Sequence, residues 1–206
     1  MPWVRSATIT AALPDRVLVD ISEWQPVAVY HADPTGKPFY LSSQAVALGP
    51  AGADPGALLA ISGPPGADPR PGRAVMDVRL LTALVNIQRE LPGLIGEEVQ
   101  SMAVDCYGNV TMTTKHGWAA YFGRVLTPEE FASLEEKLGA LKALSAEVDL
   151  HSANLTYINL MNPAAPAVGP ARNAKPAATP TPSATPPAIR PLATASPAIQ
   201  VVPQCR

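Results

Sequence analysis

The chain has 206 residues, a formal net charge of −2 at pH 7, 47% hydrophobic residues and only 5% aromatic residues. This composition suffices for one or two domains with a hydrophobic core, although large aromatic core residues are few. No run of about 18–20 apolar residues occurs, so the printed sequence contains no candidate membrane-spanning helix. The sequence also lacks the basic, aromatic-interleaved pattern that is typical of nucleic-acid binding.

Proline and charge are distributed unevenly along the chain. Residues 163–206 hold 11 of the 24 prolines, four basic residues and no acidic residue, which leaves 11 basic and 17 acidic residues elsewhere. Such an Ala-, Pro- and Thr-rich segment cannot bury enough apolar surface to fold, so we predict a disordered tail over residues 164–206. Its positive charge fits either a solvated linker or a contact with an anionic polymer.

The first 30 residues show the period of β-strands. Val17, Val19 and Ile21 occupy every second position, as expected for a strand that is covered on one face. The alternation resumes after Pro26, which separates the two segments. We therefore expect a strand at the end of residues 1–24 and the start of a second domain at residue 25.

The second domain, residues 25–163, reads as short strands and two helices. An apolar stripe predicts a helix over 74–91, ended by Pro92 and Gly93. A second helix is predicted from Pro128, where Thr127 and Glu130 can form a capping box. Strands are expected at 27–31, 38–42, 46–48 and 58–61, in an antiparallel meander over 98–107, 110–115 and 118–122, and finally at 155–161.

This order predicts an α+β fold, with a mostly antiparallel curved sheet and two helices packed on one of its faces. The last strand precedes the predicted tail, so we expect it at the sheet edge. An edge strand has unpaired N–H and C=O groups that can accept a strand from another protein.

No set of residues suggests an enzyme. His31, His116 and His151 are widely spaced, and none has a metal-ligating partner nearby in the sequence. We therefore expect no catalytic residue, no metal site, no cofactor and no small-molecule substrate. Cys106 is expected on the inner face of its strand as a buried thiol, and a bridge to Cys205 is possible but not predicted.

The start of the chain also resembles a known family. It is similar to the end of the POTRA domain of the bacterial cell-division protein FtsQ, called DivIB in Gram-positive bacteria, although Trp24 stands where that family usually has Arg. The predicted order of elements up to about residue 169 is similar to that of the FtsQ β-domain. The matching positions at the start are Pro2, Trp3, Val4, Ser6, Ala7, Leu13, Pro14, Glu23, Pro26, Val27 and Ala28.

This resemblance implies three parts: a C-terminal remnant of a POTRA domain in residues 1–24, an FtsQ/DivIB-like β-domain in residues 25–163, and the tail. It further implies that a membrane anchor precedes these parts in the full-length protein. The expected location is the extracytoplasmic face of the bacterial plasma membrane at the division septum.

The function implied by the resemblance is that of a non-enzymatic scaffold of the divisome, active in septum formation. It would bind FtsB/DivIC-like and FtsL-like proteins by β-strand addition. An alternative is a cell-wall or envelope-binding module that acts through its basic, Pro-rich tail. The partner-binding residues carried over by position are Tyr157, Asn159, Met161, Asn162, Ala167 and Val168. Tyr157 and Met161 could instead merely cover the sheet.

Overall fold

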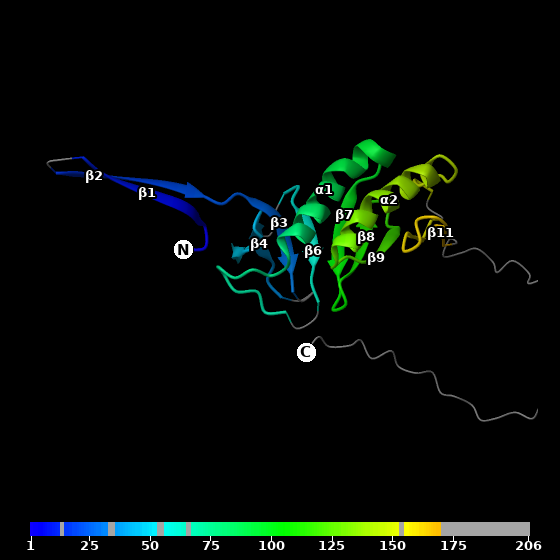
Figure 1. The fold of residues 1–206 in the computed structure, drawn as a ribbon, viewed down its shortest axis with the longest axis horizontal. Helices are drawn as coiled ribbons and strands as arrows, with labels where there is room; N and C mark the ends of the chain where they lie inside the picture. The colour runs from blue at the N-terminus through cyan, green and yellow to red at the C-terminus, as the bar shows by residue number, and fades with distance from the viewer. Residues whose placement is uncertain (13–14, 33–35, 53–55, 65–66, 153–154, 170–206) are drawn as a thin grey trace, which may run out of the picture.

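The computed structural model describes residues 1–12, 15–32, 36–52, 56–64, 67–152 and 155–169. Within these ranges the chain forms two β-sheets and two helices, α1 (Val78–Ile95) and α2 (Pro128–Ser145) (Figure 1). The predicted α+β class is confirmed. Neither described helix is long and apolar enough to cross a membrane. Most of the predicted tail, residues 170–206 with Cys205, lies outside the described residues.

The main sheet has nine described strands in the order β11-β10-β9-β8-β7-β6-β3-β4-β5. Neighbours are antiparallel except at β3–β6, β6–β7 and β9–β10, where the pairing is parallel. The four short strands and the meander that the sequence predicts are therefore present. The strands are β3 (Pro26–His31), β4 (Phe39–Ser42), β5 (Ala47–Pro50), β6 (Leu59–Ser62), β7 (Val99–Val104), β8 (Asn109–Thr114), β9 (Ala119–Arg124), β10 (Tyr157–Asn159) and β11 (Ala167–Val168).

Both helices pack side by side on one face of this sheet, and the hydrophobic core lies between the two layers (Figure 1). Alternate strand residues point into this layer, as the period of two requires. The largest side chains that are fully buried in the core are Trp118, Tyr30, Phe122, Leu41, Leu59, Ile61, Leu81, Leu84, Leu91, Met102 and Met112.

Helix α1 begins and ends later than predicted. Asp77 caps it, with its carboxylate accepting a hydrogen bond of 2.7 Å from the Arg79 amide. The residues before the cap do not extend the helix because their backbone groups bond to residues 45–47, at and just before the start of β5 (Ala47–Pro50). Pro92 does not end it either: it is exposed and lies inside the helix, which continues to Ile95. The helix ends instead at Gly96, which adopts the left-handed conformation (φ 75°) that glycine tolerates best.

Helix α2 begins as predicted. The Thr127 hydroxyl accepts from the Glu130 amide, and the Glu130 carboxylate accepts from the Thr127 amide at 3.0 Å. The same carboxylate also accepts from the Leu126 amide and from Arg124 Nε. These bonds hold the pKa of Glu130 down to about 2, mainly through the Leu126 amide and then Arg124.

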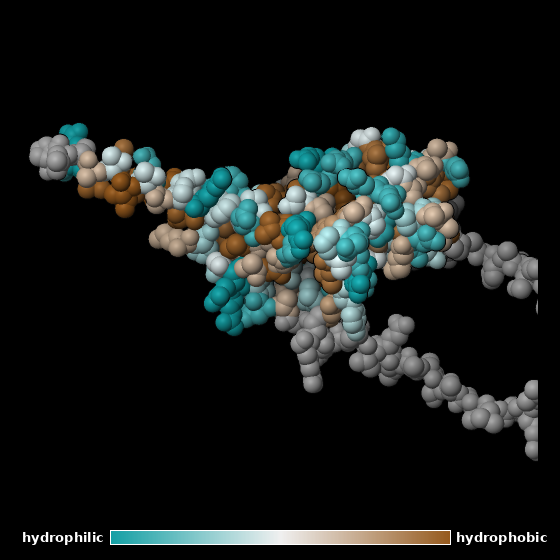
Figure 2. All heavy atoms as spheres, viewed as in Figure 1, coloured by the Kyte–Doolittle hydropathy of each residue, from teal (hydrophilic) through white to brown (hydrophobic). Residues whose placement is uncertain are grey.

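The segment before residue 25 forms a separate hairpin rather than a single strand. Strands β1 (Val4–Ala12) and β2 (Arg16–Glu23) pair only with each other and project from the main body (Figure 1). The expectation that one face of β2 is covered is wrong for the described chain, because every residue of β2 is exposed. Apolar side chains line this projection in Figure 2; the exposed ones are Ile9, Val17, Leu18, Val19 and Ile21.

The hairpin meets the main sheet through one aromatic contact. The rings of Trp3 and Tyr40 pack edge to face, with their centroids 5.9 Å apart. Trp3 also lies against Gly49 of β5, where an added Cβ would come within 3.2 Å of the indole nitrogen. The Trp24 amide donates to the Trp3 carbonyl at 2.8 Å and closes the base of the hairpin.

Candidate partner-binding edge

The carboxyl end of the described chain forms one edge of the nine-stranded sheet. The predicted final strand over 155–161 is shorter, and it is not the edge: β10 lies between β9, to which it is parallel, and β11, to which it is antiparallel. The edge is β11, which lies beyond residue 163, where the folded domain was predicted to end. The predicted location of the edge therefore has to be moved from β10 to β11.

The backbone of β11 uses one side for pairing with β10. The Gly169 amide donates to the Tyr157 carbonyl at 2.8 Å, and Ala167 lies opposite Asn159. In an antiparallel pair, successive residues direct their N–H and C=O groups alternately to either side. The N–H and C=O groups of Val168 therefore face away from β10, and no other described strand pairs with β11.

Gly169 permits the approach of this strand. It is buried, and a Cβ at this position would come within 2.2 Å of the Tyr157 ring. A side chain at this position would therefore push β11 away from β10 or displace Tyr157.

A partly exposed aromatic surface lies next to this edge on the face of the sheet away from the helices. Ile158 is fully buried towards the helices, so its neighbours in β10 point to the opposite face. There Tyr157 and Tyr121 of β9 lie with their ring centroids 5.7 Å apart. Met161 is 56% exposed and lies against Gly123. Of these side chains Tyr157 lies nearest the edge, because its ring covers Gly169 directly after β11.

The structure brings five of the six predicted partner-binding residues to this edge and its outer face. Tyr157 and Asn159 lie in β10, Met161 follows it, and the remaining two form the edge strand, Ala167 and Val168. The sixth, Asn162, lies in the connecting turn, where its side-chain oxygen accepts from the Ala164 amide at 3.2 Å.

The opposite edge of the sheet, β5, is covered by the chain itself. The Ala47 amide donates to the Arg73 carbonyl at 2.9 Å, and the Ala47 carbonyl accepts from the Gly72 amide at 2.7 Å. The Val75 amide donates a hydrogen bond to the Ala45 carbonyl at 3.0 Å. Residues 72–75 therefore occupy the outward backbone groups of Ala47 at the start of β5 and pair with the two residues just before it.

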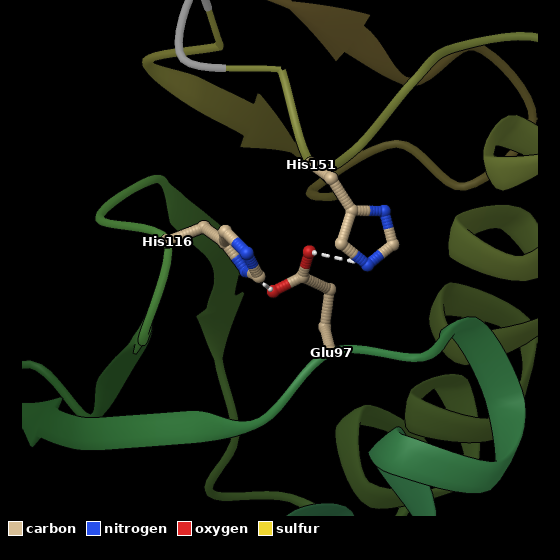
Figure 3. Close-up of side chains that lie close together, drawn as sticks. All are labelled: Glu97, His116 and His151. Atoms are coloured by element: carbon tan, nitrogen blue, oxygen red, sulfur yellow. Dashed lines mark hydrogen bonds and ion pairs between the residues drawn. The ribbon is translucent and has the colours of Figure 1, made fainter.

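One expectation about reactive side chains is corrected, and one arrangement is new. Cys106 does not lie on the inner face of a strand as a free thiol: it is half-buried in the turn between β7 and β8 and takes part in a disulfide bond. His116 and His151, although distant in the sequence, meet in space around Glu97, which sequence spacing does not reveal (Figure 3).

No protein-family model matches this chain, and a search of curated proteins also finds no match. The interpretation of the edge consequently rests on its geometry and on the sequence patterns described above.

Proposed function

We propose that this chain is a non-enzymatic scaffold that binds its partners by adding a β-strand to β11. The observation that carries this proposal is the outward-facing N–H and C=O pair of Val168 at an edge that no described strand covers. Val168 is also 39% exposed.

The partners that we propose are FtsB/DivIC-like and FtsL-like divisome proteins, which would make the chain the extracytoplasmic part of an FtsQ/DivIB-like protein. The support is the Pro2–Ala28 sequence pattern, together with the order of strands and helices around it. In this proposal the protein acts at the division septum, on the outer side of the plasma membrane.

Only a short segment of partner can pair with β11. Pro166 precedes the strand and has no N–H to donate, and β11 has two residues. The backbone contacts are therefore few, so side-chain contacts with Ala167, Val168 and the Tyr157 ring beside Gly169 would supply much of the affinity and the specificity.

Binding of the purified chain to the extracytoplasmic segments of FtsB/DivIC-like and FtsL-like proteins tests the proposal. The decisive variant is Val168→Pro, which removes the outward N–H and places a ring where the added strand would lie. The matched control is Val168→Ala, which shortens the side chain and keeps the N–H. Proline at Tyr157 or Asn159 is unsuitable because β10 is paired on both sides.

We expect Val168→Ala to bind with nearly the affinity of the original chain and Val168→Pro to bind about tenfold more weakly or worse. If Val168→Pro binds unchanged, strand addition at β11 is excluded. If the original chain binds neither segment, the proposed partners are wrong.

A further inference from the structure

Three side chains from separate connections converge at one end of the main sheet. Glu97 lies between α1 and β7, His116 in the turn between β8 and β9, and His151 in the connection from α2 to β10. His116 Nδ1 lies 2.8 Å from Glu97 Oε2, and His151 Nε2 lies 3.5 Å from Glu97 Oε1. Figure 3 shows both imidazoles directed at the two oxygens of the single carboxylate.

Glu97 is unusual because its carboxylate is fully buried. Its exposed fraction is 0%, and the ion-pair partners that the described residues offer it are the two histidines. Glu97 Oε1 has no hydrogen-bond partner among the described residues. A buried carboxylate oxygen is stabilised by a cation or a hydrogen-bond donor, so Glu97 Oε1 can serve as a ligand atom at this site.

The local backbone directs all three side chains to one point. Gly96 ends α1 in the left-handed conformation and turns the chain, so that Glu97 points under the two rings. His151 packs against Gly96, and its own amide donates to Asp149 Oδ1 at 3.0 Å, which fixes the turn that presents it. The two imidazole rings meet edge to face with their centroids 5.0 Å apart.

The donor atoms match the coordination preferences of a transition-metal ion. One donor from each of the three residues lies within 4.8 Å of the other two. Tetrahedral Zn²⁺ with ligand bonds of about 2.0–2.1 Å needs donors roughly 3.4 Å apart, so small side-chain movements suffice. Two imidazole nitrogens and one carboxylate form a ligand set that suits this ion.

We propose that Glu97, His116 and His151 bind a divalent transition-metal ion of the Zn²⁺ type. Both histidine side chains are about half exposed, at 47% and 53%, so a fourth position of the ion is accessible to water. Asp149 Oδ1 lies 3.8 Å from His151 Nδ1, where it can orient the ring from behind the ion.

The ion links three connections, including the one that leads from α2 into β10. The bound ion would therefore stabilise the position of β10, the strand with which the edge strand β11 pairs. This site does not depend on the proposed scaffold function, and either proposal can fail while the other stands.

The test uses the full chain without a polyhistidine tag, stripped of metal with a chelator and titrated with Zn²⁺ in a calorimeter. We expect one ion to bind per chain and to raise the thermal unfolding temperature. Titration with Co²⁺ gives a second readout, since its visible absorption reports a nitrogen- and oxygen-coordinated ion.

Three single variants remove one ligand each: Glu97→Gln, His116→Asn and His151→Asn. Each is expected to weaken Zn²⁺ binding by at least about tenfold. Replacing a residue that only hydrogen-bonds to a metal ligand already costs about that much, and these variants remove a ligand itself. Two controls keep the site intact: Glu98→Gln changes the exposed neighbouring carboxylate that pairs with Lys115, and His31→Asn changes the third histidine, at the end of β3. Both should bind as the original chain does.

Thermal unfolding in chelator shows whether each variant is folded. His116→Asn is the safest variant because it lies in an exposed turn. The proposal is overturned if the metal-free chain binds no Zn²⁺, or if folded His116→Asn and His151→Asn bind it as tightly as the controls do.

Discussion

The two edge strands of the nine-stranded sheet, β5 and β11, differ in which partners their outward N–H and C=O groups have. At β5 the backbone of residues 72–75 bonds to Ala45 and Ala47, and Ala74 forms a bridge with Val46. At β11 the outward N–H and C=O groups of Val168 meet no other described strand. The start of β5 is therefore covered by its own chain, whereas no described strand covers β11.

The two edges are distinguished by following the backbone hydrogen bonds of the described residues. Both edge strands are short, and a proline lies in or beside each of them, Pro50 at β5 and Pro166 before β11. Composition alone would make the two ends look alike. The hydrogen bonds of residues 72–75 distinguish them.

The largest effect is expected where the sheet and the helices share the core. Phe122 of β9 is fully buried, so Phe122→Ala should reduce the free energy of unfolding by about 3–5 kcal/mol. Tyr121→Ser, next to it on the outer face, is the control and should cost much less. Urea unfolding measures both. Equal losses would mean that β9 does not separate a buried face from an exposed one.

The closed end should be sensitive to proline. Ala47→Pro removes the amide that donates to the Arg73 carbonyl and leaves this carbonyl without its partner. We expect a loss of about 1–3 kcal/mol in the free energy of unfolding, measured by urea denaturation. A tolerated proline would show that residues 72–75 do not cover β5 in solution.

Acid should loosen the connection between β9 and α2. Glu130 bonds to Arg124 at the end of β9, and its pKa is lowered to about 2 from an ordinary value of 4.5. Because the folded pKa is the lower one, this contribution is fully present above about pH 4.5 and is lost as the pH falls towards 2. Glu130→Gln lacks it at every pH.

Denaturation midpoints measured from pH 6 to pH 2.5 compare the original chain with Glu130→Gln. The original chain should be the more stable near pH 6, and the gap should narrow as the pH falls. A gap that stays constant across this range would contradict the role assigned to the ionised carboxylate.

The smallest effect on stability is expected at the open end. The Val168 amide points away from β10, so Val168→Pro should change the free energy of unfolding by no more than about 0.5 kcal/mol. A loss of unfolding free energy as large as that of Ala47→Pro would mean that the Val168 amide is hydrogen-bonded within the chain, as the Ala47 amide is. Together, the two proline variants report directly on the comparison.

Local signals in the sequence predict most of the fold. The cap at Thr127 and the turn between β8 and β9 lie where the residue types predict them, because these features depend on neighbours in the chain. The turn between β7 and β8 comes earlier than predicted, since β7 ends at Val104 and Asn109 already begins β8. The start of α1 could not be predicted in this way. The apolar period continues back to Ala74, but the backbone there pairs with Val46, just before β5, and no local pattern records that contact.

The candidate sites show the same limit. A two-residue strand between Pro166 and Gly169 is too short to have a period, so the last strand appeared to be β10. The cluster of Glu97, His116 and His151 arises because the chain enters β7 and leaves β8 at the same end of the sheet, close to the connection into β10. The spacing of these residues along the sequence does not predict that they meet.

Amide hydrogen exchange, followed residue by residue by NMR, tests the difference between the two edges most directly. In the free protein we expect the Ala47 amide to be protected and the Val168 amide to exchange rapidly, and a saturating partner segment should slow exchange at Val168 without changing it at Ala47. Protection of Val168 in the free protein, or rapid exchange there while the partner is bound, would contradict the assignment of β11 as the open docking edge.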